Sequence, residues 1–355
     1  MPEIRIDVMD EYEIIDKIGE GTYSTVYKVL HRSNQQLYAL KVLKKSFETI
    51  ESIREFEEIL IMSNLEVNPY IISLYDIIYE PSHSRVSLVI DLMEMNLLEY
   101  SSRRKDISFS SGIKILQQCF NALAFLHSNN IIHGDIKPEN ILINPKSLTV
   151  KIGDFGCALD CSFSYGPITN IATRWYLSPE FLLSGEIGSA FDIWSLGCSF
   201  MEVLAKKPLF PGKSQNHQIK LIQSALNYGV FDSYLLSFYP KFACAPDLYQ
   251  LLTRMLTFSP TTRITAQRAL SNVVFTPKNP KKSTSSSPVV NKLKRDSLSN
   301  GTNKNNPQNQ QKKSNDTLPP SIPDLRKPHE LKKVSTPSHK NHDPNIIRSS
   351  KKGNK

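Results

Sequence analysis

The chain has 355 residues, of which 40% are hydrophobic, and it carries a formal net charge of +9. This content supports a folded core, but no run approaches the roughly 18–20 apolar residues of a membrane-spanning helix. The N-terminus lacks the layout of a signal peptide, and the five cysteines form no Cys-x2-Cys pair. The composition therefore argues against a disulfide framework, a zinc site and membrane insertion.

The excess of basic over acidic residues is confined to the end of the chain. Residues 276–355 contain 18 Lys+Arg and 5 Asp+Glu, which leaves 25 basic and 29 acidic residues in 1–275, a net charge of −4. The same 80 residues contain no Phe, Tyr or Trp. Such a segment buries too little apolar surface to offset its ordering entropy, so we predict a basic disordered tail at 276–355.

After an N-terminal arm at 1–10, the first part of the chain has strand character. Alternating and β-branched runs separated by turn residues predict strands at 12–15, 24–29, 37–42, 71–78 and 86–90. Between them, an apolar stripe that includes Ile53, Phe56 and Ile59 predicts one helix over 49–65. These elements define a first lobe at 11–93, ending in a hinge.

Beyond Glu94 the pattern becomes helical. Long amphipathic or apolar stretches at 111–127 and 190–204 predict helices, and the second lobe extends over 94–275. A strand-rich lobe followed by a helix-rich lobe indicates an α+β fold.

A glycine-containing turn lies between the first two strands. Residues 19–26 read Gly-Glu-Gly-Thr-Tyr-Ser-Thr-Val. Two glycines permit a tight turn whose amides can approach phosphate groups. Because Ser24 replaces the third glycine of a G-x-G-x-x-G pattern, this turn taken alone is better interpreted as an ordinary glycine hairpin. A Walker-type loop is excluded, since no Gly-Lys-Ser/Thr follows.

Lys41 lies on the third predicted strand, where it is either a phosphate ligand or a solvated charge. The first role requires a carboxylate from the helix at 49–65. Glu58 shares a helical face with Met62 and Leu65, so it points toward the sheet. We therefore predict that Glu58 orients Lys41, with Glu57 as the alternative.

Two motifs in the second lobe carry chemical information. Residues 132–140 read Ile-His-Gly-Asp-Ile-Lys-Pro-Glu-Asn, and Asp154-Phe155-Gly156 follows. Together they resemble the catalytic centre of the eukaryotic protein kinases. The resemblance implies the bilobal kinase fold and a serine/threonine protein kinase that uses ATP and Mg²⁺.

The resemblance also implies a role for each motif residue. Asp135 would accept the proton of the substrate hydroxyl or orient that hydroxyl, and Lys137 would neutralise the γ-phosphate. Asn140 and Asp154 would hold Mg²⁺, and Thr173 would hydrogen-bond Asp135 and Lys137. With Ile90 as gatekeeper, the implied ATP-binding residues are Ile18, Gly19, Glu20, Gly21, Val26, Ala39, Lys41, Glu58, Ile90, Asp91, Met93 and Leu142.

Other segments narrow the resemblance to one group of kinases. Ser178-Pro179-Glu180 would close the activation segment, with Glu180 paired to Arg263, and Asp192 would brace the catalytic loop. Residues 173–176 and 208–212 are similar to the CMGC group, which contains the cyclin-dependent and MAP kinases. Within it the chain resembles the MAPK/MAK/MRK-overlapping kinases.

Three positions depart from the pattern of that group. Gly134 replaces the arginine that clamps an activating phosphate, and Leu177 replaces an arginine that shapes a pocket for proline. Ile168-Thr169-Asn170 stands where Thr-x-Tyr is common, with Thr169 displaced by one position. We therefore predict activity without dual activation-loop phosphorylation and a weakened preference for proline.

An active kinase is favoured over a catalytically weak kinase or pseudokinase acting as a scaffold, because Lys41, Asp135, Lys137, Asn140 and Asp154 are all present. We expect a cytoplasmic monomer that acts on Ser/Thr of protein substrates. The basic cluster at 292–295 could serve nuclear import or bind anionic partners, although a solvated tail is the simpler interpretation.

Overall fold

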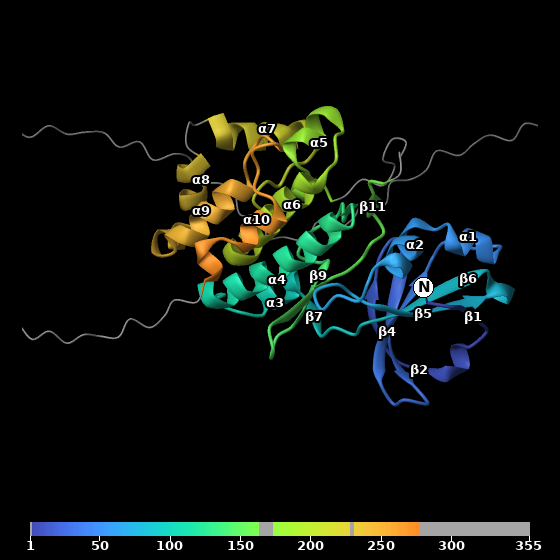
Figure 1. Cartoon of the computed structure of the whole chain (residues 1–355). Coiled ribbons are helices and arrows are strands. Elements are labelled where there is room, and N and C mark those ends of the chain that lie inside the picture. Colours follow the sequence, from blue (N-terminus) through green and yellow to red (C-terminus); the bar gives the residue numbers. More distant parts are fainter. Residues whose placement is uncertain (1, 163–172, 228–230, 277–355) are drawn as a thin grey trace, which may run out of the picture. The chain divides into compact units, whose positions relative to one another are not determined.

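The computed structural model describes residues 2–162, 173–227 and 231–276 of the chain. Within these ranges the first lobe is a six-stranded sheet with two short helices, and the second lobe is mainly helical (Figure 1). The predicted α+β fold of two lobes is thereby confirmed. The sheet has the order β1-β5-β6-β4-β3-β2. Its strands are β1 (Ile4–Ile6), β2 (Tyr12–Glu20), β3 (Ser24–His31), β4 (Leu37–Leu43), β5 (Leu74–Glu80) and β6 (Arg85–Ile90).

Apolar side chains on both faces of this sheet are buried. Successive residues of a strand point to opposite faces, so Ile77 and Ile78 of β5 enter different clusters. One cluster contains Tyr12, Val29, Leu40, Ile78 and Val89. The other joins the sheet to the helices and contains Leu43, Phe47, Ile53, Ile59, Ile77, Tyr79, Val86 and Leu88.

The prediction of one helix over 49–65 is wrong. Two helices form instead, α1 (Ile50–Arg54) and α2 (Glu57–Asn64), and α1 begins with a capping box from Thr49. Phe56 between them is extended, at φ −72° and ψ 118°, and its ring packs on Phe47 with centroids 5.4 Å apart. This ring contact accompanies the break, which the local apolar periodicity did not indicate.

Two strand boundaries also differ from the predictions. The first strand extends from Tyr12 to Glu20 and includes part of the expected glycine turn. The strand predicted at 71–78 begins at Leu74, while Ile71 forms an isolated parallel bridge with Ile152. The predicted arm at 1–10 contains β1 and the first residues of the 3₁₀ helix η1 (Met9–Glu11).

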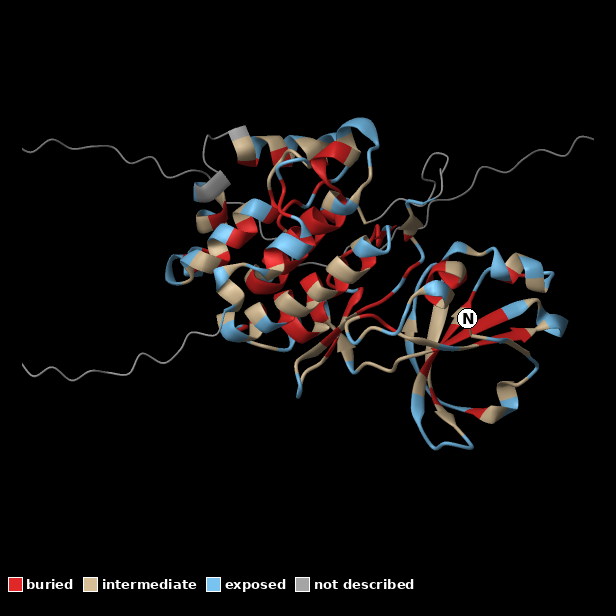
Figure 2. Cartoon of the chain, viewed as in Figure 1, coloured by how far each residue is buried: buried red, intermediate tan, exposed pale blue. Residues whose placement is uncertain are grey.

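The second lobe is built around α6, along which buried residues are concentrated (Figure 2). The helices predicted at 111–127 and 190–204 lie inside α4 and α6. No helix within the described residues is long and apolar enough to cross a membrane. The helices are α3 (Leu97–Ser102), α4 (Phe109–Ser128), α5 (Pro179–Ser184), α6 (Ser189–Ala205), α7 (Gln215–Asn227), α8 (Phe231–Phe238), α9 (Pro246–Met255) and α10 (Ala266–Leu270).

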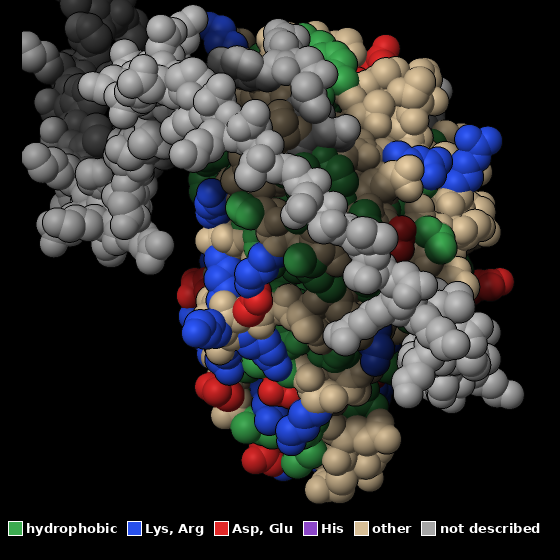
Figure 3. All heavy atoms as spheres, turned by 90° about the vertical axis from the view of Figure 1, so that its left-hand side faces the viewer, with side chains coloured by type: hydrophobic (Ala, Val, Ile, Leu, Met, Phe, Trp, Pro, Cys, Tyr) green, Lys and Arg blue, Asp and Glu red, His purple; other side chains and the backbone are tan. Residues whose placement is uncertain are grey.

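Short strands and 3₁₀ helices complete the lobes. The strands are β7 (Met95–Asn96), β8 (Ile131–Ile132), β9 (Ile141–Asn144), β10 (Thr149–Ile152) and β11 (Leu159–Asp160). The remaining 3₁₀ helices are η2 (Pro81–His83), η3 (Arg174–Tyr176), η4 (Pro240–Cys244) and η5 (Val273–Phe275). On the face shown in Figure 3, Lys and Arg side chains gather in groups, with some Asp and Glu side chains among them.

Candidate active site

The loop between β8 and β9 carries most of the predicted catalytic residues, and Asp192 of α6 holds its first part. Asp192 is fully buried and accepts hydrogen bonds from the backbone amides of His133, at 2.9 Å, and Gly134, at 3.0 Å. Its carboxylate also contacts Nε2 of His127 at 2.9 Å. Three contacts on one buried carboxylate fix where the loop starts, because a buried charge without partners is costly.

Gly134 has a conformation and surroundings that suit glycine. Its φ is +77°, in the left-handed region. A Cβ atom built on it would lie 2.4 Å from the carbonyl oxygen of Cys157. The space beside Gly134 is therefore occupied by the backbone that follows Asp154-Phe155-Gly156.

Asp135 is the centre of a group of polar contacts. Its Oδ2 accepts from Lys137 Nζ at 2.5 Å and from Asn140 Nδ2 at 3.1 Å, and Asn140 also donates to its backbone oxygen at 2.8 Å. Oδ1 accepts from the backbone amide of Thr173 at 3.0 Å, whereas the Thr173 hydroxyl accepts from Lys137 at 3.0 Å. Thr173 thus contacts both residues as expected, but it reaches Asp135 through its backbone.

Lys41 of β4 links the two lobes through carboxylates. Its Nζ donates to Glu58 of α2 at 2.5 Å and to Asp154 at 2.7 Å. Burial disfavours the charge on Lys41 and on Asp154, but Glu58 and Asp154 raise the pKa of Lys41, and Lys41 lowers the pKa of Asp154. Lys41 and Asp154 are therefore held in their charged forms.

The oxygen atoms near Asp154 suit a magnesium ion. Lys41 contacts Oδ1 of Asp154, which leaves Oδ2 for another cation. Asn140 uses its amide nitrogen toward Asp135, so its oxygen remains as a ligand. Mg²⁺ in nucleotide sites is usually held by one or two such oxygens together with phosphates and water, and these two residues fit that role.

Most of the predicted ATP-binding residues of the first lobe lie on adjoining strands. Gly19 on β2 pairs with Val26 on β3, which pairs with Lys41, while Ala39 on β4 pairs with Ile90 on β6. Ile18, which precedes Gly19, is 46% exposed. The pairing places Gly19, Val26 and Lys41 side by side across three strands.

The turn from β2 to β3 is held by hydrogen bonds to its backbone carbonyl groups. The amide of Gly21 donates to the carbonyl of Ser24 at 2.8 Å, and Lys44 donates to the carbonyl of Gly21 at 2.7 Å. The Glu20 side chain contacts Lys17 and Lys44, so only its backbone is available to a phosphate.

The hinge follows β6 and contacts residues of β9. Leu142 of β9 pairs with Asn96, and Met93 accepts a weak hydrogen bond on its sulfur from Asn144 at 3.7 Å. The amide of Glu94 donates to the same Asn144 side chain at 3.0 Å. The segment that would contact adenine is therefore anchored to the second lobe.

The sequence did not indicate that Lys151 has a structural role at the hinge. Lys151 of β10 donates to Asp91 at 2.8 Å and to the carbonyl of Ile71 at 3.1 Å. Asp91 also accepts from the amide of Ser73, at 2.7 Å, and from the Tyr75 hydroxyl, at 2.9 Å. Burial alone would raise the pKa of Asp91, yet Lys151 keeps it below its ordinary value. The only available signal was a lysine three residues before Asp154.

The end of the activation segment is fixed by a buried ion pair. Arg263 binds Glu180 through two hydrogen bonds, of 2.7 and 2.8 Å, and donates to the carbonyl of Ala190. Leu177 nearby is fully buried. Ile168-Thr169-Asn170 lie outside the described residues.

Fold and site together have the layout of a protein kinase. A lysine paired with a helix glutamate lies in the first lobe, and an Asp-x-Lys-x-x-Asn loop with the spacing of kinase catalytic loops lies in the second. A hinge separates the two lobes.

Comparisons with known proteins agree with this layout. The protein kinase domain model matches residues 12–275. The chain is 34% identical over 288 residues to the MAPK/MAK/MRK overlapping kinase of Mus musculus, covering 75% of this chain and 68% of that protein. It is 33% identical over 298 residues to mitogen-activated protein kinase spk1 of Schizosaccharomyces pombe, covering 76% and 79%. It is also 33% identical over 291 residues to cyclin-dependent kinase 1 of Encephalitozoon cuniculi, covering 75% and 97%.

The chain therefore belongs to the protein kinase family. These relatives are all CMGC kinases, which confirms the predicted group.

Proposed function

We propose that this chain is a serine/threonine protein kinase that transfers the γ-phosphoryl group of ATP to protein hydroxyls. The observation that carries the proposal is the set of contacts around Asp135. Lys137, Asn140 and the amide of Thr173 all bind this residue within 3.1 Å. Such contacts fix both oxygens of a carboxylate that must face the substrate hydroxyl.

Each of these side chains would have a separate role in the reaction. Asp135 orients the attacking hydroxyl and accepts its proton, while Lys137 offsets negative charge on the transferred phosphoryl group. Lys41, held by Glu58, orients the other phosphates. A bound Mg²⁺, held by Asn140 and Asp154, would supply charge neutralisation at those phosphates. The new bond joins the substrate oxygen to the γ-phosphorus, and the bond to the bridging oxygen of ADP breaks.

The preference for Ser/Thr is supported by Lys137 and Thr173. Lysine two residues after the catalytic aspartate is typical of serine/threonine kinases, and here it bonds Thr173 at 3.0 Å. This contact joins the catalytic loop to the segment that precedes η3, where a substrate peptide would bind.

We further propose that activity does not require dual phosphorylation of the activation segment. Gly134 offers no cation, and Leu177 is buried and apolar. A phosphate orders a loop through nearby arginines, so the absence of arginine at position 134 removes one of its expected partners. The absence of arginine at position 177 bears instead on the pocket for proline.

Phosphorylation of a Ser/Thr peptide library tests the catalytic proposal. The wild-type chain should transfer phosphate with ATP and Mg²⁺, whereas Asp135→Asn and Asp154→Ala should lose about 10³-fold or more in kcat. Glu186→Gln, an exposed carboxylate between α5 and α6, is the matched control and should retain full activity. Transfer by the wild type that is no faster than by Asp135→Asn would favour the scaffold.

Phosphatase treatment tests the proposal that activity does not require phosphorylation of the activation segment. Treated wild type should keep its kcat, and Leu177→Arg should increase the preference for proline after the target residue. Activity that returns only after an upstream kinase phosphorylates the chain would refute independence from phosphorylation.

A further inference from the structure

The arm before the kinase domain adds a strand to its sheet. Ile4, Arg5 and Ile6 of β1 pair in parallel with Ile77, Ile78 and Tyr79 of β5, and the amide of Asp7 donates to the carbonyl of Tyr79 at 3.0 Å. β5 thus has neighbours on both sides, and β1 forms the edge of the sheet beside α1 and α2 (Figure 1).

One face of β1 contacts the helices. Ile4 packs on the apolar cluster that contains Ile53 of α1 and Ile59 of α2. Pro2, Glu3 and Ile4 also line a cavity of about 290 Å³ together with residues of both helices and of β5. The arm therefore lies against α2, the helix that carries Glu58.

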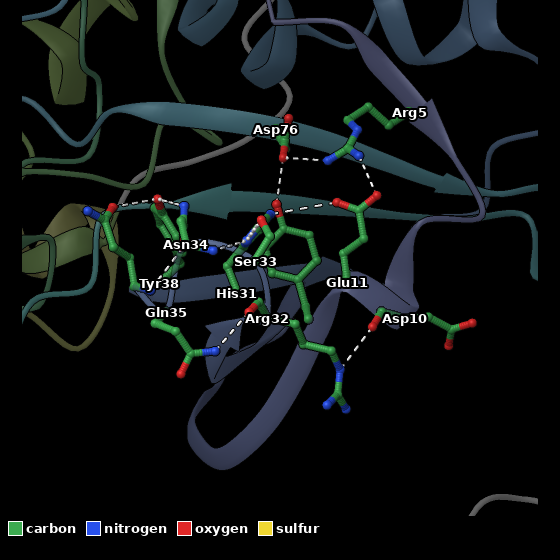
Figure 4. A network of polar contacts seen from close by, with 12 residues as sticks. Arg5, Asp10, Glu11, His31, Arg32, Ser33, Asn34, Gln35, Tyr38 and Asp76 are labelled. Carbon is green, nitrogen blue, oxygen red and sulfur yellow. Dashed lines mark hydrogen bonds and ion pairs between the residues drawn. The ribbon is translucent and has the colours of Figure 1, made fainter.

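The other face of β1 is tied to the sheet by Arg5 (Figure 4). Its guanidinium group contacts Glu11 at 2.6 Å and Asp76 of β5 at 3.1 Å. The Tyr12 hydroxyl donates to the same Asp76 oxygen at 2.5 Å. The two carboxylates raise the pKa of Arg5, although burial opposes this shift. Arg5 thus joins β1, η1 and β5 at one point.

The position of α2 depends on such packing. With 8 residues it has about two turns, fewer than an isolated helix needs to be stable in water. Glu58 faces Lys41, while the next residue, Ile59, enters the cluster that Ile4 joins. A change at Ile4 can therefore alter the distance between Glu58 and Lys41 without any contact with ATP.

We propose that Ile4 and Arg5 are positioning residues, which hold α2 so that Glu58 stays on Lys41. The N-terminal strand is an intramolecular brace for the ATP-binding lysine. This inference rests on the proposed kinase activity.

Kinetics of full-length variants test the brace. Ile4→Asp and Arg5→Ala should each lower kcat/KM for Mg·ATP by about tenfold at a temperature well below the lowest Tm, with KM for the peptide unchanged. Ile6→Asp is the matched control, since Ile6 lies on the same strand but is 49% exposed. It should stay within about twofold of wild type. Arg5→Lys should restore part of the loss.

A double-mutant cycle shows whether the effect passes through Glu58. In a Glu58→Gln background, Ile4→Asp should change kcat/KM by less than about twofold, because the contact it protects is already weakened. A full tenfold loss in both backgrounds would overturn the proposal, as would a lower Tm with unchanged kinetics.

Amide hydrogen exchange measures the local stability of α2 directly. Amides of residues 57–64 should exchange faster in Ile4→Asp and Arg5→Ala than in wild type or Ile6→Asp. Equal exchange in all four proteins would refute the brace. An inactive wild type that shows the expected exchange differences would instead refute only the proposed function. If Ile4→Asp does not fold, Arg5→Ala decides both measurements.

Discussion

Replacing Gly134 with alanine should damage the catalytic loop through the backbone alone. The change adds one methyl group and no charge. At φ +77° that methyl group would lie 2.4 Å from the carbonyl oxygen of Cys157 and 3.3 Å from its carbonyl carbon. The neighbour is backbone rather than a flexible side chain, so either the loop or the segment after Asp154 must move.

Two costs add at this position. A residue with a Cβ in the left-handed region costs about 1–2 kcal/mol. Forcing extra atoms into a packed site costs about 1–3 kcal/mol more. We therefore expect Gly134→Ala to lower the free energy of unfolding by about 2–5 kcal/mol. Since Asp135 follows directly, a displacement near 1 Å should also reduce kcat by about 10²-fold.

Gly185→Ala provides the matched control. Gly185 has a similar φ of +74°, ends α5, and has nothing within 4 Å of its added Cβ. It should show only the first cost, about 1–2 kcal/mol. Urea unfolding gives the free energy of unfolding of both variants, and initial rates give their kcat. Equal losses of stability, with normal kcat in Gly134→Ala, would show that the contact with Cys157 does not restrict this position.

Three further predictions concern charges away from the phosphates. Arg263→Met leaves Glu180 buried and unpaired, so the free energy of unfolding in urea should fall by about 3–5 kcal/mol, and a loss below about 1 kcal/mol would contradict this. Lys151→Met should lower the free energy of unfolding, measured by thermal unfolding, by about 1–3 kcal/mol and should raise KM for ATP. Adding Asp91→Asn to the same chain should recover part of that stability, because the buried carboxylate is then no longer an unpaired charge. Losses that simply add in the double variant would show that Lys151 and Asp91 are not coupled. Burial raises the pKa of Glu202, so the folded state binds more protons and its stability falls as pH rises between the unfolded and folded pKa values. The Tm of Glu202→Gln should therefore rise relative to that of wild type as the pH increases above about 4, and parallel pH profiles of the two proteins would count against this.

The sequence predicted the contacts among the candidate site residues better than the boundaries of the elements. Glu58 was selected because it shares a face with Met62, and it does contact Lys41 at 2.5 Å. The broken helix did not affect this inference, since the break at Phe56 precedes both residues and α2 keeps their spacing. The predicted partners of Asp135 also lie within hydrogen-bonding distance, although the Thr173 contact is made by its amide.

Contacts between distant segments account for what the sequence did not predict. β1 forms because its backbone can pair with the edge of β5. The three residues of β1 are too few to show the apolar periodicity by which a strand is predicted. Likewise, nothing local to Lys151 indicates that it binds Asp91, 60 residues away.

The fold class, the kinase motifs and the departures at Gly134 and Leu177 could be predicted from the sequence, because they depend on residue type and on spacing within a segment. The start of the helix that carries Glu58, the contacts that support this helix and the reason why glycine suits position 134 are visible in the folded chain alone. Those features arise when segments far apart in the chain pack together, and local patterns carry no record of such neighbours.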